Sequence, residues 1–152
     1  MTDRPDHAEY PPLGGPDGAA FAAALGTGSP HVARCRACEF EFYYPRPFCP
    51  RCLHDEIDLV PCTGPLTVLS YTYVYRVQSP IFEESVPALM LALAGGDGLR
   101  IIVEGSSWNH EPQIGATAWL ACKQRPDQSY VLVGEPDKPL MQGSGTSGRR
   151  DA

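Results

Sequence analysis

Short, largely apolar segments separated by turns that contain glycine or proline run through the stretch 59–133, and this pattern is typical of β-strands. Turn residues divide the stretch into five segments, each short enough for one strand. We expect strands at Leu66–Val77, Val86–Ala94, Leu99–Glu104, Ala116–Lys123 and Tyr130–Val133. Only Gly95-Gly96-Asp97-Gly98 separates the second from the third, which predicts a hairpin. Five short strands with tight turns favour a small closed barrel, because closure removes exposed strand edges.

A helical pattern precedes these strands. Phe21 and Leu25 lie four residues apart in an alanine-rich run, so that they share one face of a helix. Asp17 is placed to cap this helix and Gly26 to end it. We therefore expect a helical arm over residues 16–30. Its apolar face either packs on the rest of the domain, which we favour, or docks a partner.

Both ends of the chain differ in composition from the middle. Residues 1–15 contain three prolines and a glycine pair, and residues 134–152 are rich in glycine, serine and proline. We expect a disordered leader and a disordered tail. The first ten residues are polar and acidic and do not resemble a secretory signal, and no run of 18 apolar residues occurs. These features favour a cytoplasmic protein.

Cysteine carries the clearest chemical signal. Four of the six cysteines form two C-x-x-C pairs, Cys35/Cys38 and Cys49/Cys52, with ten residues between the pairs. Each C-x-x-C directs two thiolates toward one point, and ten residues can form a hairpin that returns the second pair to the first. The pattern predicts a closed tetrahedral Cys₄ site for a structural Zn²⁺ in a ribbon over residues 31–54.

Other interpretations of the paired motifs remain open. They include a redox-active C-x-x-C, an iron site of the same geometry, and a ribbon that keeps its cysteines but loads metal poorly. His31 and His54 flank the ribbon and are alternative ligands. If all four cysteines bind, the site has no open coordination position and cannot activate water. Its role is then to fold a segment too small for its own core.

Charge limits the classes of partner. The chain has 12 basic and 18 acidic residues and a formal net charge of −6. Proteins that bind nucleic acid through bulk positive charge neutralise phosphates with many lysines and arginines. The acidic balance therefore argues against that class.

No assembled catalytic set is visible. Nucleophile elbows, H-E-x-x-H and Walker loops do not occur. His7 lies in the leader, and His110 lies in a polar loop beside Glu111, where a solvated role is favoured over that of a base. Cys62 and Cys122 lie beside or within predicted strands, which favours a buried apolar role over that of an active thiol.

The ordered motifs together resemble the DUF35 family of zinc-ribbon OB-fold proteins. The matching segments are Cys35-Arg-Ala-Cys38, Phe42-Tyr-Tyr-Pro-Arg46, Cys49-Pro-Arg-Cys52, Gly64-Pro-Leu-Thr-Val-Leu-Ser-Tyr-Thr72, Phe82-Glu-Glu-Ser-Val-Pro87 and Ile114-Gly115. The resemblance covers residues 16–133. It implies a mostly β protein with an N-terminal helical arm, a Cys₄ zinc ribbon and a five-stranded OB-fold barrel at 59–133. Glu39 departs from the family, which usually has glycine there for a turn with positive φ.

The resemblance also implies a function. Members of the family are usually bound to enzymes that act on acyl-CoA thioesters, most often a thiolase-like or lipid-transfer-type aldolase. The small subunit completes or stabilises the partner's active site and CoA path, and it is not known for catalytic residues of its own. The expected role is therefore a non-catalytic accessory subunit in a hetero-oligomer.

Two features of the sequence could bind a ligand. Arg34, Arg36, Arg46 and Arg51 surround the two C-x-x-C pairs, and they suit CoA phosphates or an acidic partner surface. Tyr71, Tyr73 and Tyr75 share one face of a strand, where an OB barrel can stack bases. No lysine accompanies the tyrosines, so core packing or a protein interface is favoured. A single-stranded nucleic-acid-binding module remains the alternative function.

Overall fold

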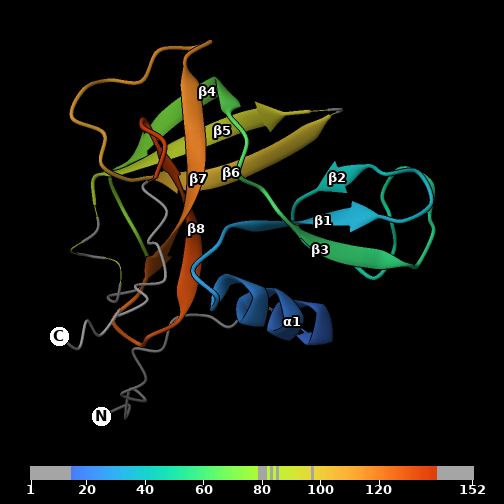
Figure 1. Cartoon of the computed structure of the whole chain (residues 1–152). Coiled ribbons are helices and arrows are strands. Elements are labelled where there is room, and N and C mark those ends of the chain that lie inside the picture. The colour runs from blue at the N-terminus through green and yellow to red at the C-terminus, as the bar shows by residue number, and fades with distance from the viewer. Residues whose placement is uncertain (1–14, 79–81, 83, 85, 97, 140–152) are drawn as a thin grey trace, which may run out of the picture.

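The structure is a computed structural model that describes residues 15–78, 82, 84, 86–96 and 98–139 (Figure 1). Most of the expected leader and tail therefore lies outside the described residues. In chain order the elements are α1 (Gly15–Leu25), β1 (His31–Cys35), β2 (Glu41–Phe42), β3 (Ile57–Pro61), β4 (Leu66–Val74), β5 (Ala88–Gly95), β6 (Leu99–Gly105), β7 (Thr117–Gln124) and β8 (Tyr130–Glu135). No helix in these ranges has the length and apolar character needed to span a membrane.

The first three strands form the sheet of the ribbon, in the order β2-β1-β3. Both pairings are antiparallel, and Cys35 at the end of β1 lies opposite Ile57 at the start of β3. Sequence analysis placed the ribbon at 31–54, and the sheet takes its third strand from the residues that follow. Phe40, Phe42 and Tyr44 alternate with Glu41 and Tyr43, a period typical of a strand, but only the two-residue strand β2 forms here.

The remaining five strands close into a barrel in the order β4-β5-β6-β8-β7, with β7 pairing back to β4. All neighbours are antiparallel except β6 and β8, which run parallel at Glu104↔Val133 and Gly105↔Gly134. A bulge between Val68 and Ser70 lets β4 bend from β7 toward β5. This is a barrel of the OB type, and the predicted mostly β fold with a short helix, a cysteine ribbon and a five-stranded barrel is confirmed.

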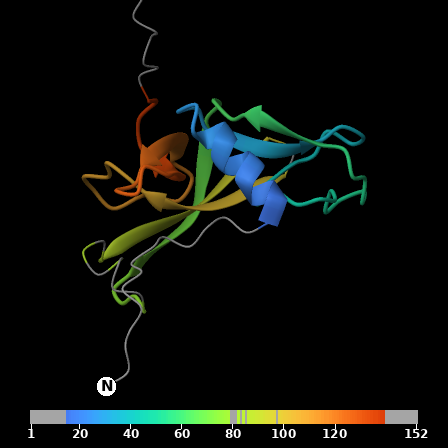
Figure 2. The ribbon, with the colours of Figure 1, turned by 90° about the horizontal axis from the view of Figure 1, so that it is seen from below.

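The helix packs on the barrel and the ribbon. It contacts β8 and β1 and lies beneath the junction of the two units (Figures 1 and 2). Phe21 and Leu25 are each 1% exposed and belong to the same core cluster as the inward-facing barrel residues. Full burial of such side chains contributes about 1.5–3 kcal/mol each. The preference for packing over docking of this face is confirmed.

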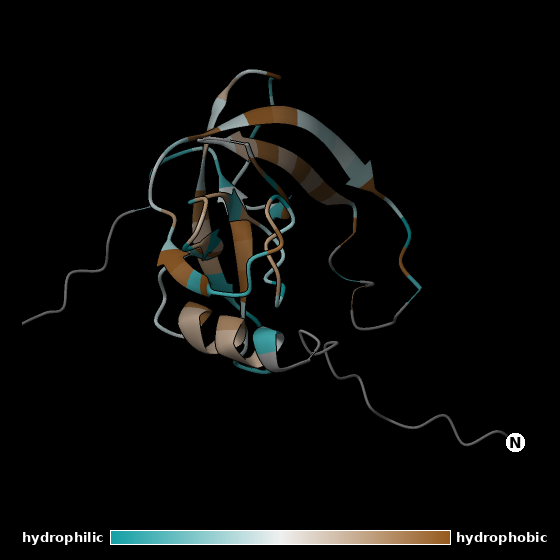
Figure 3. Cartoon of the chain, turned by 90° about the vertical axis from the view of Figure 1, so that its right-hand side faces the viewer, coloured by the Kyte–Doolittle hydropathy of each residue, from teal (hydrophilic) through white to brown (hydrophobic). Residues whose placement is uncertain are grey.

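The hydropathy of the residues differs between the helix, the barrel and the ribbon (Figure 3). Helix α1 is apolar along most of its length and has a hydrophilic band near one end, where Asp17 lies in the first turn. The barrel core is built by the alternating inward residues of its strands, for example Leu91 and Leu93 of β5 and Ile101 of β6. The ribbon has a separate core of only four buried residues, Ala33, Cys35, Phe42 and Cys49.

Candidate metal centre and arginine groove

The two C-x-x-C segments form a pair of matching knuckles. In the first, the backbone N–H of Glu39 donates to the carbonyl of Cys35 at 2.9 Å, and in the second the N–H of Leu53 donates to the carbonyl of Cys49 at 2.9 Å. Glu39 has φ 58° and Leu53 has φ 64°. Both knuckles therefore use a left-handed residue directly after the second cysteine. The departure of Glu39 from glycine leaves the turn itself intact.

The knuckles bring the four cysteine sulfurs together. Their Sγ atoms all lie within 4.8 Å of one another, with the Cys35–Cys52 and Cys38–Cys49 pairs at 3.6 Å. A tetrahedron with Zn–S bonds of about 2.3 Å has sulfur–sulfur edges of roughly 3.8 Å. The donor set and its spacing thus fit Zn²⁺ bound by four thiolates, and they support a structural zinc.

The electrostatics of the sulfurs also favour a cation. Burial raises the pKa of the Cys49 thiol, but backbone N–H groups of Cys52 and Arg51 donate to its sulfur and bring the pKa down to about 7. At Cys52 the backbone N–H of His54 lowers the pKa, but burial and the three neighbouring thiols outweigh it and raise the pKa to about 12. Four thiols this close resist ionising together unless a cation compensates their charge.

The histidines considered as alternative ligands do not join this cluster. The metal-ligating group that the described residues form contains cysteines only. The Nδ1 atom of His31 lies 2.7 Å from the carbonyl of Ser29, and the Nδ1 atom of His54 accepts the backbone N–H of Glu56 at 3.2 Å. Each histidine has a local partner in the flanking turns.

The remaining two cysteines lie apart from the knuckles. Cys62 is buried, and Cys122 is half-buried in β7. Burial raises the pKa of each thiol to about 11. Both are neutral at physiological pH, as the apolar role expected from the sequence requires.

The four arginines around the knuckles divide into two pairs. Arg36 forms a bidentate ion pair with Asp58, with Nε–Oδ2 at 2.9 Å and Nη2–Oδ1 at 2.8 Å, and this pair lowers the pKa of Asp58. Arg34 donates to the carboxylate of Glu39 at 3.0 Å. These two guanidinium groups are occupied within the ribbon.

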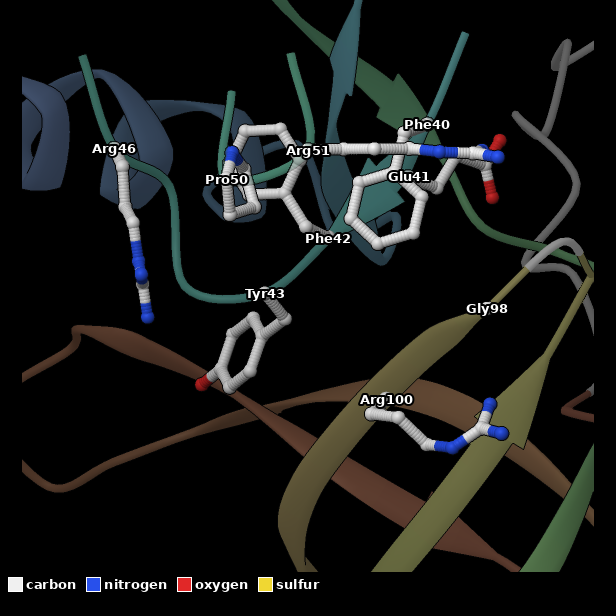
Figure 4. Close-up of a pocket in the computed structure, with 9 residues that line it drawn as sticks. All are labelled: Phe40, Glu41, Phe42, Tyr43, Arg46, Pro50, Arg51, Gly98 and Arg100. Carbon is white, nitrogen blue, oxygen red and sulfur yellow. The ribbon is translucent and has the colours of Figure 1, made fainter. Parts of the chain in front are cut away.

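The other two, Arg46 and Arg51, line a hollow between the ribbon and the barrel, which we call the ribbon–barrel groove. Its volume is about 510 Å³, and its lining consists of Phe40, Glu41, Phe42, Tyr43, Arg46, Pro50, Arg51, Gly98 and Arg100. Figure 4 shows Arg46 reaching from the ribbon loop toward the barrel, with Arg100 on strand β6 below. Arg51 extends across Phe40, with its guanidinium carbon 5.7 Å from the ring centroid.

The two walls of the groove approach each other closely at Phe40 and Gly98. The ring of Phe40 comes within 3.1 Å of where a Cβ on Gly98 would lie, and Gly98 has φ 105° at the turn between β5 and β6. Sequence analysis missed Arg100 as a member of the groove. Its position between the inward Leu99 and Ile101 predicts an outward side chain, but nothing local indicates that the ribbon lies over it.

Tyr71 and Tyr73 lie near the end of β4, and Tyr75 follows the strand. Tyr71 donates to the carboxylate of Glu111, and this hydrogen bond raises the pKa of Tyr71. Tyr73 packs edge-on against Tyr71, and Tyr75 is 70% exposed. His110 is exposed and lies 6.0 Å from Trp108 between ring centroids, as expected for a loop residue.

Fold and cysteine site together define a zinc-ribbon protein with an OB-type barrel. Comparison with known families supports this class, since residues 32–58 match the family described as "ChsH2, rubredoxin-like zinc ribbon domain". No curated protein matches the chain.

Two solved structures share the fold. One, described as "Ltp2-ChsH2(DUF35) aldolase", has a TM-score of 0.68 and 24% identity and covers 83% of this chain and 98% of its own. The other is a DUF35 protein of unknown function from Sulfolobus solfataricus, with a TM-score of 0.54 and 20% identity, covering 81% and 87%. The resemblance to the DUF35 family expected from the sequence is confirmed by the ribbon match and by these two structures.

Proposed function

We propose that this chain is a non-catalytic accessory subunit of an enzyme that acts on acyl-CoA thioesters. The observation that carries the proposal is the match to a zinc ribbon of the ChsH2 type on a fold shared, over 83% of the chain, with a structure described as an Ltp2-ChsH2(DUF35) aldolase. Fold alone does not determine function, so the proposal rests on the fold together with the ribbon.

The partner in this proposal is a thiolase-like or lipid-transfer-type subunit, and the assembly is a hetero-oligomer. The partner would carry the catalytic residues, and this chain would complete or stabilise its active site. Exposed aromatic residues and arginine are enriched where proteins dock. The ribbon surface offers both, with Tyr44 and Phe48 more than half exposed near Arg46 in the sequence.

The described residues support a non-catalytic role. Their cysteine, serine and threonine side chains make no hydrogen bond with a histidine side chain, so no activated nucleophile of that kind is formed. A Cys₄ centre filled by zinc has no open position for water. In this proposal zinc binds Cys35, Cys38, Cys49 and Cys52, and its contribution is to fold the ribbon.

The proposal includes a contact with the CoA part of the substrate. Of the four arginines first considered, Arg46 and Arg51 are the better candidates, because Arg34 and Arg36 already bind carboxylates. Arginine suits phosphate because its planar guanidinium presents paired donors.

Affinity capture from the native host tests the proposed function. The tagged full-length chain should retain a stoichiometric partner that mass spectrometry identifies as thiolase-like, and the eluted complex should turn over acyl-CoA thioesters. A tagged Cys49→Ser variant provides the matched control, because an unfolded ribbon should not retain the partner. Elution of the chain alone, or with single-stranded nucleic acid in place of a protein, would contradict the proposal.

A further inference from the structure

The two knuckles of the ribbon share one backbone conformation. Besides their matching turn hydrogen bonds, the N–H of Cys35 donates to the carbonyl of Phe40 at 3.0 Å, and the N–H of Cys49 donates to the carbonyl of His54 at 2.8 Å. Both loops lie at the end of the ribbon sheet where β1 ends and β3 begins (Figure 1). Matching positions of the two knuckles therefore hold their side chains in corresponding places.

The side chains that flank the first knuckle are charged and paired. Arg34 precedes its first cysteine and Glu39 follows its second, and the two side chains form an ion pair of 3.0 Å across the knuckle. Arg36, between the two cysteines, is paired with Asp58. The first knuckle thus presents a polar surface whose charges are already paired within the chain.

The same two flanking positions of the second knuckle carry apolar side chains, which we call the knuckle pair. Phe48 precedes the first cysteine and is 56% exposed, and Leu53 follows the second and is 75% exposed. Because the backbones match, these positions face each other across the knuckle as those of Arg34 and Glu39 do. Large apolar side chains that gather on a surface mark contact sites.

The backbone at Leu53 is a second, independent reason to look for a contact. Its φ of 64° disfavours a residue with a Cβ, and glycine or asparagine would form the same turn more easily. Glu39 has the same conformation, but its carboxylate gains the ion pair with Arg34. Strained residues persist where the strain serves a function. Folding of the chain alone therefore does not explain a leucine at this position.

The residues that follow the knuckle pair are acidic. Asp55 and Glu56 are both exposed, and the carboxylate of Asp55 lies 3.9 Å from Nδ1 of His54. Within the described residues, neither carboxylate forms an ion pair with a lysine or an arginine. A protein that covers the knuckle pair therefore meets negative charge beside it. The complementary surface is an apolar pocket bordered by basic side chains.

We propose that the knuckle pair inserts into an apolar pocket, bordered by lysine or arginine, on the acyl-CoA enzyme subunit. The identity of this partner rests on the proposed function, whereas the chemistry of its pocket rests on the knuckle itself. Phe48 and Leu53 are the apolar anchors, and Asp55 and Glu56 pair with the basic border. The first knuckle, whose charges are paired within the chain, stays outside the contact.

Calorimetric titration of the zinc-loaded full chain with the thiolase-like subunit, purified from the captured complex, tests the inference. Leu53→Gly should weaken binding by at least about tenfold, because the burial of the leucine is lost. Leu53→Asn suits the same backbone conformation but has a polar side chain, and it should weaken binding as much. Leu53→Met keeps an apolar side chain of similar size and should bind within about threefold of the parent.

The first knuckle supplies the matched control. Glu39→Gly makes the same backbone change at the matching position and should leave binding unchanged. Phe48→Ala should weaken binding by at least about tenfold. Asp55→Asn combined with Glu56→Gln should weaken binding and reduce its dependence on salt.

Stability separates a docking role of Leu53 from a structural one. Zinc content and the thermal unfolding curve of each variant confirm that it folds. Leu53→Gly should lose affinity for the partner while it is at least as stable as the parent. A merely structural role would instead make stability and binding fall together.

Three results would overturn the inference. They are parental affinity in both Leu53→Gly and Leu53→Asn, an equal loss in Glu39→Gly, and self-association of the chain alone that Leu53→Asn abolishes. The last result would assign the knuckle pair to a contact between copies of this chain. A partner that restores activity but binds the Leu53 variants like the parent refutes the inference and leaves the proposed function standing. Failure to capture any thiolase-like subunit would refute both.

Discussion

Each knuckle of the ribbon places a residue with a side chain where glycine is preferred. Leu53 has φ 64° and is 75% exposed, so its side chain adds little packing in return for its backbone conformation. Glu39 has the same conformation, but its carboxylate accepts a hydrogen bond from Arg34. The two positions share one backbone requirement and differ in what their side chains contribute.

Leu53→Gly should therefore stabilise the zinc-loaded protein. Removing the side chain relieves the strain of the left-handed backbone conformation. This gain exceeds the entropic cost of ordering a more flexible glycine by about 1 kcal/mol. Urea unfolding with zinc held in excess measures the change, and Leu53→Ala, which keeps a Cβ, should show little of it. A Leu53→Gly protein less stable than Leu53→Ala would contradict this account of the knuckle.

The two cysteines outside the knuckles, Cys62 and Cys122, should ionise only at high pH. Burial raises the pKa of Cys62 and Cys122 to about 11, so both thiols stay protonated in the folded protein at pH 8. Only the thiolate reacts with thiol reagents. Modification of the zinc-loaded native protein should be slow at pH 8 and accelerate toward pH 11.

The raised pKa of the two thiols also makes the stability of the folded protein depend on pH. The folded state keeps these protons up to about pH 11, whereas the unfolded thiols lose theirs near the ordinary value of 9.0, so the contribution to stability is lost as pH rises between those values. Fast modification of both cysteines at pH 8 in the native state would show that they are not buried as described.

At the scale of elements, the ribbon cannot fold on its apolar residues alone. Its core has four buried members, and two of them, Cys35 and Cys49, belong to the cysteine cluster. Segments this small need a metal or disulfides, and structural zinc supplies about 10–16 kcal/mol of apparent binding energy in comparable sites. Metal and ribbon should therefore form together.

Cys49→Ser should lose the metal and unfold the ribbon. We expect about one zinc per chain in the parent protein, and elemental analysis should find markedly less in the variant. Cys122→Ser changes the same atom in β7 and should keep its zinc. Limited proteolysis should cut the Cys49→Ser protein within residues 31–54. A variant with normal zinc content, or an uncut ribbon without metal, would contradict the Cys₄ assignment.

Strand β8 packs closely against the barrel core at Gly134. A Cβ on Gly134 would lie 2.8 Å from Leu91 and 3.4 Å from Leu93 and Val103. Gly134→Ala should therefore destabilise the protein by about 1–3 kcal/mol through overpacking. Gly64→Ala is the matched control, since its Cβ meets nothing within 4 Å, and it should be neutral or slightly stabilising. Equal unfolding midpoints for the two variants would contradict the described core.

The elements show what sequence could and could not predict. The barrel strands were found because short apolar segments and turn residues are local signals. The cysteine cluster followed from C-x-x-C spacing, which is also local. The ion pair of Arg36 was not predictable, because its partner Asp58 lies 22 residues away on β3. Strand pairing alone brings the two side chains together. Arg100 joined the groove through packing of Phe40 on Gly98, a tertiary contact.

At the scale of the whole molecule, helix, ribbon and barrel form one connected unit. Phe21 of α1 and Val32 of β1 belong to the barrel's core cluster, and Phe21 also contacts Tyr43 of the ribbon loop at 5.9 Å between ring centroids. This packing fixes how the ribbon lies on the barrel. A partner that docks on both units therefore meets a surface that is already arranged, which lowers the entropic cost of binding.

Reconstitution of activity tests the central claim most directly. The partner captured from the native host is purified alone, and its turnover of an acyl-CoA thioester is measured while the zinc-loaded chain is titrated in. Neither protein alone should sustain turnover, and activity should rise and saturate at a fixed ratio of the two chains. Steady turnover by this chain alone, abolished by a point substitution within it, or full activity of the partner without it, would contradict the account.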